Sequence, residues 1–392
     1  MKLCIVSSVF PRYEGDPSAS WLVKLIQCLQ QRGIEVLVYC PSFKGLKDQV
    51  IHGIKVRRFR YFPKAWENVT HDQGAPNKIK NPIYLFVAFF YILFGLIQFI
   101  PYCRREKFDI IHVHWPFPHG IWGYAGARLS NAKLVLHFHG AELFLIQRFR
   151  FVKYFLRHAI RHANAITTNS SFNKEDILAI EPCQVEVLGF GSTVEEKPYV
   201  KEQHSKKQIL FTGRFIERKG LSYLIQAMPR VMSKVNCELI LVGDGDQKAL
   251  LEHLVKKLKL EDTVRFAGVL SIEELTHRYQ QCDVYALPSI VDSKGDTEGL
   301  GVVLIEALIY KKPVVACRVG GITDIVKDRQ TGLLVPEKDP EALAEALIEV
   351  MTNEELAASL GKAGYAHVKK MYDWDGITER LIGIYKNVLC TA

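Results

Sequence analysis

The chain has 392 residues, of which 48% are apolar and 24% are charged. This length predicts two domains of about 150 to 200 residues each, and the composition excludes a disordered protein. The net charge of +9 is uneven, because residues 1–190 hold 24 Lys and Arg against 13 Asp and Glu. We therefore expect the first half to face something anionic, either a membrane surface, a phosphorylated substrate or nucleic acid.

The nine cysteines are scattered and form no CxxC pair, in a chain far larger than disulfide-stapled scaffolds. We expect reduced thiols and a cytoplasmic location. The N-terminal stretch MKLCIVSSVF is too short an apolar run for a signal peptide, and a first buried strand explains it better.

Short apolar runs alternate with amphipathic stretches along the whole chain, which predicts parallel sheets covered by helices on both faces. The predicted strands are 3–9, 35–39, 110–114, 133–137, 208–211, 238–242, 264–267, 284–287 and 313–316. The predicted helices are 19–32, 221–234, 247–259 and 340–352.

The domain joint is expected in a Gly- and Lys-rich stretch without apolar periodicity. This divides the chain into a first domain at 1–190, a linker at 191–206, a second domain at 207–372 and a last helix at 373–392. Ligands of open α/β sheets bind beyond the carboxyl ends of the strands, so we expect a ligand in a cleft between the domains.

The segment 83–100, IYLFVAFFYILFGLIQFI, is almost wholly apolar. As a helix it would be about 27 Å long, close to the ~30 Å hydrocarbon thickness of a bilayer. It is either a buried or groove-lining helix, a helix in the bilayer surface, or a transmembrane span. Predicted strands of one sheet on both sides disfavour a span. Cations at both ends favour an anionic membrane surface: Lys78, Lys80, Arg104, Arg105 and Lys107.

Two cations follow the strand 208–211 in the motif FTGRFIERKG, which places Arg214 and Lys219 five residues apart at a strand-to-helix turn. A diphosphate needs cations and backbone N–H donors at such a turn. Arg214 can bind two oxygens at once, while Lys219 acts as a point charge. Taken alone, such a pair is more often a solvated surface pair.

A second loop, in KGDTEGLGVVLIEAL, leads into a helix expected to begin near Gly299. The amides of Gly299, Leu300 and Gly301 would point at an anion or at sugar oxygens. Glu298 stands at the start of this segment. Glu306 lies two turns into the helix, where a carboxylate can accept hydrogen bonds from vicinal hydroxyls. The spacing alone is equally compatible with a helix-capping acid and a surface acid.

The motifs GRFIERKG, VRFAGVL, EGLGVVLIEA, PVVACRVGGITDIV and TGLLV occur in this order, after DIIHVHWPFPHG and LVLHFHGAEL. Together they resemble the retaining glycosyltransferases of family 4, in particular enzymes of bacterial polysaccharide and lipid-linked glycan synthesis. The resemblance covers nearly the whole chain. It implies an α/β protein of the GT-B fold, with two Rossmann-like parallel-sheet domains that face each other across a cleft. The last helix would cross back to the first domain.

The resemblance places the donor site in the second half of the chain. It implies that Arg214 and Lys219 bind the diphosphate, that Glu306 holds the nucleotide ribose and that Glu298 lies near the donor sugar. The loop that contains Arg265 would border the nucleobase through backbone groups. The other donor-binding residues implied there are Gly213, Phe266, Gly268, Gly299, Leu300 and Gly301.

In the first half, the resemblance assigns His139 of HFHGAEL to the donor sugar. This histidine would orient a hydroxyl or stabilise developing positive charge through its backbone carbonyl. The implied catalytic residues are therefore His139, Arg214, Lys219 and Glu298.

The first loop, FPRYEGDPSASW, has Gly15-Asp16 where the family has a Gly-Gly pair that approaches the donor phosphate. Gly15 is the corresponding donor-binding candidate. Arg12 and Asp16 are candidates for acceptor binding.

We predict no metal and no other cofactor. The spacing of Asp244 and Asp246 imitates a metal motif, but they stand where the family has a Gly-x-Gly turn. The pairs His112 with His114 and His137 with His139 each alternate along a strand, yet no Cys or acidic partner has matching spacing for zinc.

The sequence thus predicts a metal-independent retaining glycosyltransferase of class EC 2.4. It would move a sugar from a UDP- or GDP-sugar to a glycan or lipid-linked acceptor, on the inner face of the cell membrane. The alternatives are a nucleotide-sugar epimerase of the same fold and a non-catalytic subunit that binds nucleotide sugar or membrane. No arrangement of basic and aromatic residues indicates nucleic-acid binding.

Overall fold

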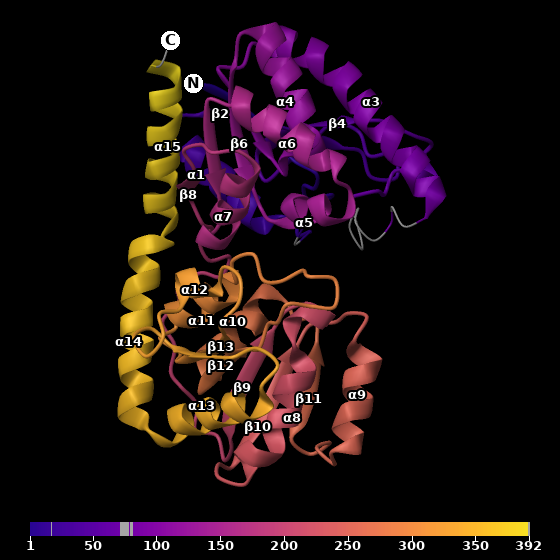
Figure 1. The fold of residues 1–392 in the computed structure, drawn as a ribbon. Helices are drawn as coiled ribbons and strands as arrows, with labels where there is room; N and C mark the ends of the chain where they lie inside the picture. The colour runs from indigo at the N-terminus through magenta and orange to yellow at the C-terminus, as the bar shows by residue number, and fades with distance from the viewer. Residues whose placement is uncertain (17, 71–77, 79–80, 391–392) are drawn as a thin grey trace. The chain divides into compact units, whose positions relative to one another are not determined.

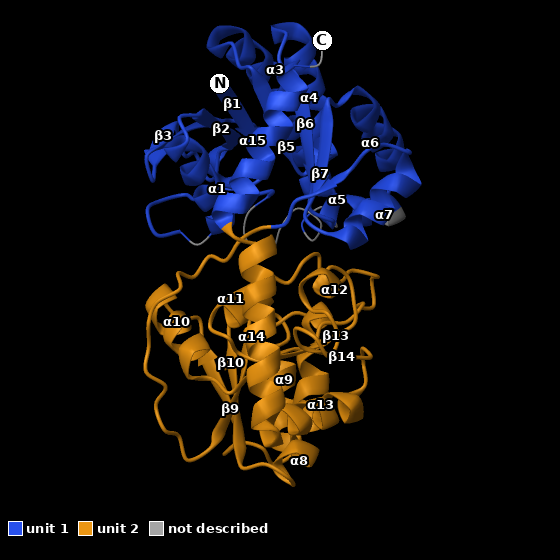
Figure 2. Cartoon of the chain, turned by 90° about the vertical axis from the view of Figure 1, so that its left-hand side faces the viewer, with its two compact units in different colours: residues 1–189, 374–392 blue, residues 190–373 orange. Residues whose placement is uncertain are grey.

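The computed structural model describes residues 1–16, 18–70, 78 and 81–390. The chain divides into two compact units, shown separately coloured in Figure 2. Unit 1 contains residues 1–189 and 374–392, and unit 2 contains residues 190–373. Each unit has a sheet of its own, covered by helices, as Figure 1 shows.

Within the described part of unit 1, eight strands form one sheet in the order β3-β4-β2-β1-β5-β6-β7-β8, in which β3 and β4 pair antiparallel and the other neighbours pair parallel. The strands are β1 Lys2–Val6, β2 Glu35–Pro41, β3 Gln49–Ile51, β4 Ile54–Phe59, β5 Ile110–His114, β6 Lys133–Phe138, β7 Ala165–Thr168 and β8 Glu186–Val187. The helices are α1 Ser20–Gln31, α3 Pro82–Glu106, α4 Pro116–Ser130, α5 Ala141–Arg148, α6 Phe151–His162, α7 Ser171–Ile180 and α15 Trp374–Cys390.

Two hydrophobic cores cover the two faces of this sheet. Helices α3, α4 and α6 contribute to one core, and α1 and α15 contribute to the other. The last helix, α15, is fixed to unit 1 by Arg32, which forms ion pairs with Asp375 and Glu379. On the same helix, the Tyr385 hydroxyl lies 2.7 Å from Nδ1 of His112 on β5.

Unit 2 has a wholly parallel sheet of six described strands in the order β11-β10-β9-β12-β13-β14. The strands are β9 Lys207–Thr212, β10 Cys237–Val242, β11 Val264–Gly268, β12 Val284–Leu287, β13 Val314–Cys317 and β14 Leu333–Val335. The helices are α8 Leu221–Met232, α9 Lys248–Lys257, α10 Ile272–Gln281, α11 Val302–Ile309, α12 Ile322–Ile325, α13 Pro340–Thr352 and α14 Glu354–Met371.

Every predicted strand and helix forms, with shifts of a few residues at the ends. The first strand ends at Val6 instead of residue 9, because the Ser7 hydroxyl donates to the Val9 carbonyl and turns the backbone. Residues 191–206, expected to be a linker, belong to unit 2. Thr193 and Tyr199 hold this segment there by hydrogen bonds to Glu306 and to the carbonyl of Tyr310.

The apolar helix α3 is longer than the segment 83–100 and has two different faces. Its inner face is fixed to unit 1: the Tyr39 hydroxyl donates to the carbonyl of Gly95 (2.7 Å), and the indole of Trp122 donates to the carbonyl of Ile92 (3.0 Å). A Cβ on Gly95 would lie 2.3 Å from the Trp122 ring. This half of the helix is therefore part of the core.

The outer face of α3 is exposed. Its side chains are 49–60% exposed at Ile83, Leu85, Phe86, Phe89 and Ile97. By length and composition, α3 is long and apolar enough to cross a membrane. Only 22% of its most apolar window is buried in the structure, whereas the core helix of a soluble protein is mostly buried. The alternative of a buried helix therefore accounts for one face only. Of the flanking cations, Lys80 lies outside the described residues.

Candidate active site

The carboxyl ends of three neighbouring strands of unit 2 are joined by backbone hydrogen bonds. The amide of Gly213, after β9, donates to the carbonyl of Val242 (2.9 Å). The amide of Gly243, after β10, donates to the carbonyl of Gly268 (2.8 Å). Gly243 has φ +135°, and a Cβ there would lie 1.9 Å from the Gly213 carbonyl oxygen, so the position requires glycine. Two predicted donor-binding loops thus meet at one sheet edge.

The turn that contains Asp244 and Asp246 supports the neighbouring loop. The amide of Phe215 donates to the carbonyl of Asp244 (2.8 Å), and a Cβ on Gly245 would lie 2.3 Å from the Phe215 carbonyl oxygen. Close packing between two backbones explains the glycines of this turn.

Lys219 and Glu298 form a buried ion pair at this edge. The ammonium group of Lys219 pairs with Oε2 of Glu298, and Nη1 of Arg218 lies 3.4 Å from the same oxygen. The Ser289 hydroxyl donates to that oxygen at 3.4 Å. Burial alone would raise the pKa of Glu298, but the charges of Lys219 and Arg218 lower it to about 2. Glu298 is therefore ionised at neutral pH.

Arg214 belongs to the same turn and has an exposed side chain. The sequence interpretation named Arg214 and Lys219 but missed Arg218, which contacts Glu298 and also donates to the carbonyl of Thr297 (3.1 Å). The signal for Arg218 was its place in the motif ERKG, directly before Lys219. The structure thus brings three cations onto one turn, of which two contact Glu298.

The segment of Gly299, Leu300 and Gly301 is positioned by a second glycine pair. Helix α11 begins at Val302, with Gly301 as its N-cap, close to the predicted start. The Gly321 amide donates to the carbonyl of Glu298 (2.9 Å), and a Cβ on Gly321 would lie 2.2 Å from the carbonyl oxygen of Gly299. The motif VGGI therefore fixes the backbone beside the ion pair.

Replacing Gly321 with alanine should displace this backbone, since the clash is with a carbonyl and not with a flexible side chain. We expect a loss of about 2 kcal/mol in the free energy of unfolding. We also expect roughly 100-fold lower kcat/KM, because a displacement near 1 Å at a reacting centre costs about that much. Urea denaturation and steady-state kinetics measure the two effects. Gly383→Ala on α15 is the control, since its Cβ would have no neighbour within 4 Å.

Glu306 lies within α11 and is only 5% exposed. The Thr193 hydroxyl donates to Oε1 (2.6 Å), and the Tyr279 hydroxyl donates to Oε2 (2.7 Å). Burial raises the pKa of Glu306, and these two hydrogen bonds oppose the rise. Neither partner was expected from the sequence, because both are distant along the chain. The Thr193 backbone also interacts with this carboxylate. A carboxylate has about four lone-pair sites, so a further donor can still bind it.

Arg265, Phe266 and Gly268, which were expected to border the nucleobase from a loop, lie within strand β11. Arg265 is largely exposed, and its Nε lies 3.0 Å from Oε2 of Glu238. The ring of Phe266 meets Phe215 edge-on, with 6.0 Å between their centroids. Gly268 has φ +70° and accepts the hydrogen bond from Gly243. The side chains of this strand thus serve packing and surface contacts, and its backbone pairs with Ile240 and Leu241 of β10. The role of the segment at the nucleobase stays a prediction.

In unit 1, His139 follows β6 and stacks on Trp115, with ring centroids 4.0 Å apart. Its amide donates to Oε1 of Glu142 (2.8 Å). Burial lowers the pKa of His139 well below its usual value and raises that of Glu142 to about 7. His139 is therefore a neutral imidazole at neutral pH, held by a buried carboxyl and an indole.

The two acceptor candidates bind each other. Nε of Arg12 lies 2.6 Å from Oδ2 of Asp16, which also accepts from the Arg12 amide (2.9 Å). Burial by itself raises the pKa of Asp16, but these hydrogen bonds lower it far below its usual value. Gly15 has φ +87°, and a Cβ there would meet no atom within 4 Å. In this structure the Asp16 carboxylate holds the loop by its bonds to Arg12. Gly15 provides the positive φ that the turn before Asp16 requires.

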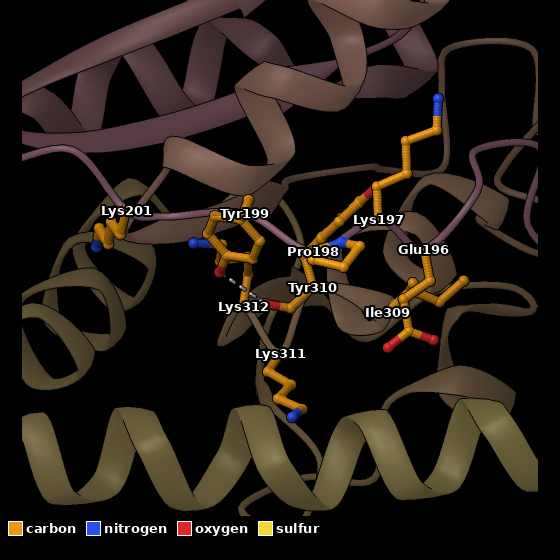
Figure 3. Close-up of a pocket in the computed structure, with 9 residues that line it drawn as sticks. All are labelled: Glu196, Lys197, Pro198, Tyr199, Lys201, Ile309, Tyr310, Lys311 and Lys312. Atoms are coloured by element: carbon orange, nitrogen blue, oxygen red, sulfur yellow. Dashed lines mark hydrogen bonds between the residues drawn. The ribbon is translucent and has the colours of Figure 1, made fainter.

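A pocket of about 710 Å³ lies elsewhere on unit 2 (Figure 3). It is lined by residues 196–199 and 201 and by residues 309–312, and it includes none of the predicted site residues. Its lysines point in different directions, and Nζ of Lys312 donates to the carbonyl of Gln280 (2.6 Å). The pocket therefore does not present converging cations to an anion.

Two family models match the chain. The model described as Glycosyltransferase Family 4 matches residues 19–191, and the model described as Glycosyl transferases group 1 matches residues 193–367. The chain belongs to the glycosyltransferases of the family 4 type, which are enzymes of class EC 2.4. Its two parallel-sheet α/β units have the GT-B fold.

Among curated relatives, an uncharacterized glycosyltransferase of Methanocaldococcus jannaschii is 26% identical over 98% of both chains. A GDP-mannose-dependent monoacylated alpha-(1-6)-phosphatidylinositol monomannoside mannosyltransferase of Corynebacterium glutamicum is 31% identical over 56% of this chain and 58% of its own.

Among solved structures, sucrose-phosphate synthase of Thermosynechococcus elongatus matches with a TM-score of 0.80 and 21% identity over 100% of both chains. HepE of Anabaena, solved with UDP-glucose, matches with a TM-score of 0.70 and 18% identity over 99% of this chain and 100% of its own. Both likenesses concern the fold.

Proposed function

We propose that this enzyme transfers a hexose or a related sugar from a UDP- or GDP-sugar to a glycan or lipid-linked acceptor, with retention of the anomeric configuration. The observation that carries the proposal is the buried pair of Lys219 and Glu298, with Arg218 beside it. It joins cations for a diphosphate with a carboxylate for a sugar hydroxyl, next to the backbone at the start of α11. The GDP-mannose and UDP-glucose of the relatives support the donor class.

Each residue has a role in the proposed reaction. Arg214 and Lys219 neutralise the departing diphosphate, Glu306 accepts from the ribose hydroxyls, and Glu298 binds the sugar. The resemblance assigns His139 of unit 1 to the donor sugar as well. The bond between sugar C1 and the phosphate oxygen breaks on the face where the acceptor oxygen bonds to C1. The acceptor proton passes to the leaving phosphate. Because the cations balance the developing negative charge, the transfer needs no metal ion.

A panel of UDP- and GDP-sugars, with membrane extract as acceptor, tests this proposal. We expect one donor to release its nucleoside diphosphate while its sugar enters an extractable product. Proton NMR should show that the product keeps the anomeric configuration of the donor. A chelator such as EDTA should leave the rate unchanged. Failure to turn over any donor, an inverted product, or abolition of the rate by EDTA would each contradict a stated part of the proposal.

We further propose that the enzyme works as a peripheral protein on the anionic inner face of the cell membrane. The exposed face of α3 supports this, and so does a second apolar patch on α6, where Phe151, Tyr154 and Phe155 are exposed. Arg104 and Arg105 stand in the last turn of α3. Apolar side chains beside cations are the two signals that stable anchoring to an anionic bilayer needs.

A further inference from the structure

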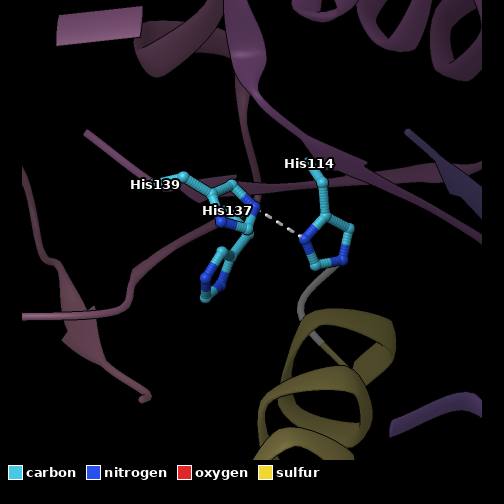
Figure 4. A group of neighbouring side chains, drawn as sticks. All are labelled: His114, His137 and His139. Carbon is cyan, nitrogen blue, oxygen red and sulfur yellow. Dashed lines mark hydrogen bonds between the residues drawn. The ribbon is translucent and has the colours of Figure 1, made fainter. Parts of the chain in front are cut away.

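Two pairs of histidines from different strands meet at the carboxyl ends of β5 and β6. His114 lies opposite His137 in the parallel register of these strands. The ring centroids of His114 and His137 are 5.1 Å apart, those of His114 and His139 are 5.2 Å apart, and those of His137 and His139 are 4.8 Å apart. Figure 4 shows the three side chains grouped together. From the sequence, the pair His112 and His114 and the pair His137 and His139 were considered separately. The register of β5 and β6 brings them into one cluster.

The ligand nitrogens of this cluster are close enough for one ion. One nitrogen from each of His114, His137 and His139 lies within 4.8 Å of the others. Nδ1 of His114 and Nε2 of His139 are 3.0 Å apart. Tetrahedral zinc, bound at about 2.0–2.1 Å, holds its nitrogen ligands about 3.3 Å from one another. One pair of nitrogens is thus already near this separation, and any pair that lies farther apart, up to 4.8 Å, must come closer on binding.

A neighbouring hydroxyl orients His137 for this role. The Thr167 hydroxyl donates its one hydrogen to the carbonyl of Leu136 (3.2 Å), so it must accept the hydrogen bond that links it to Nδ1 of His137 (2.8 Å). Nδ1 therefore carries the hydrogen, and Nε2 offers a lone pair. Metal-binding histidines are commonly held in this way by a partner on the other ring nitrogen.

His114 supplies a second ligand nitrogen. Its ring is fully buried, and its Nε2 has no hydrogen-bond partner among the described residues. Its Nδ1 shares a single hydrogen with Nε2 of His139. Both of these nitrogens become ligands when the donating ring moves that hydrogen to its other nitrogen, with no net release of protons. With Nδ1 bound, the hydrogen of His114 is on Nε2, which stays buried, so the metal–nitrogen bonds must outweigh that cost.

We propose that His114, His137 and His139 bind one divalent transition-metal ion such as Zn²⁺, with a fourth position open to water or another small ligand. Three imidazoles with an open position suit zinc, copper and nickel better than magnesium or calcium, which prefer oxygen ligands. The proposal goes beyond the glycosyl transfer. His139 is also the residue proposed at the donor sugar, so bound metal would take that imidazole from the sugar, and the test below therefore reads metal binding without turnover.

The test uses the full chain in a background that lacks one other histidine pair and the exposed thiol. On α6, His158 and His162 have rings 4.3 Å apart, and Cys390 is an exposed thiol. The background variant is therefore His158→Ala, His162→Ala and Cys390→Ser. After removal of metal by a chelator, calorimetry with Zn²⁺ should show one site per chain. X-ray absorption of the loaded protein should show three imidazole ligands.

Single substitutions in this background then locate the site. His137→Gln should weaken zinc binding at least 100-fold, and Thr167→Val should weaken it 10- to 100-fold through loss of the orienting hydroxyl. His112→Gln is the matched control, since His112 lies on the same strand as His114 and is bound to Tyr385. We expect it to keep the background affinity, and thermal unfolding confirms that each variant is folded. Absence of stoichiometric binding, or equal losses in His112→Gln and His137→Gln, would overturn the assignment.

Discussion

Replacing Lys219 with methionine should lower kcat/KM for the nucleotide-sugar donor by about 10³-fold, the upper range for losing one group that stabilises developing charge. Methionine keeps the length and apolar stem of the side chain and removes the ammonium group. The substitution also leaves Glu298 buried with Arg218 as its remaining cation at 3.4 Å. Breaking a buried ion pair in this way costs about 3–5 kcal/mol. Chemical denaturation and steady-state kinetics should therefore both show a large loss.

The double variant Lys219→Met with Glu298→Gln separates catalysis from folding. It removes both charges, so most of the lost stability should return, whereas the activity should not. If activity returned together with stability, the ammonium group would have only a structural role. If the single variant kept more than about a tenth of the wild-type kcat/KM, the diphosphate assignment would be wrong, because the loss would be far below the range expected for such a group.

Making the outer face of α3 polar should abolish most binding to anionic vesicles. In the variant Phe86→Ser, Phe89→Ser and Ile97→Ser, each side chain loses about 1 kcal/mol of transfer free energy, since each is roughly half exposed before binding. Three such losses correspond to about 100-fold weaker partitioning. Flotation with vesicles of phosphatidylcholine and phosphatidylglycerol measures the effect.

The matched control for α3 removes three exposed apolar side chains elsewhere, at Val50, Val200 and Leu250. We expect this triple serine variant to float like the wild type. Vesicles of pure phosphatidylcholine should bind the wild type less, because the cations at the end of α3 then meet no anionic lipid. Equal flotation of the α3 variant and the wild type would show that the exposed face of this helix does not bind the membrane.

The sequence predicted the α/β class and most strands, because strands buried on both faces form continuous apolar runs that local composition reveals. It missed β4, whose sequence IKVRRF places cations beside apolar residues. It also missed β7, which is short and contains two threonines, and the strands β3, β8 and β14, which have only two or three residues each. Such strands are defined by their neighbours in the sheet more than by their own composition.

In the candidate site, too, some residues could be predicted from local sequence and others only from the fold. Lys219, Glu298 and Glu306 stand out because their motifs combine charges with glycines at a predicted strand-to-helix turn. The partners of Glu306 could not be predicted, because Thr193 and Tyr279 reach it only through the fold. For the same reason, the histidine pairs of β5 and β6 showed no common site until the register of the two strands was known.

The most direct test of the proposed donor site is the affinity of Glu306→Ala for the accepted nucleotide sugar, measured by titration calorimetry beside the wild type. Hydrogen bonds from two ribose hydroxyls to a carboxylate contribute about 1.5–3 kcal/mol each, so we predict at least 100-fold weaker binding. Thr193→Val, which removes one partner of Glu306 and keeps the carboxylate, should change the affinity far less. Unchanged nucleotide-sugar binding in a folded Glu306→Ala variant would contradict the account.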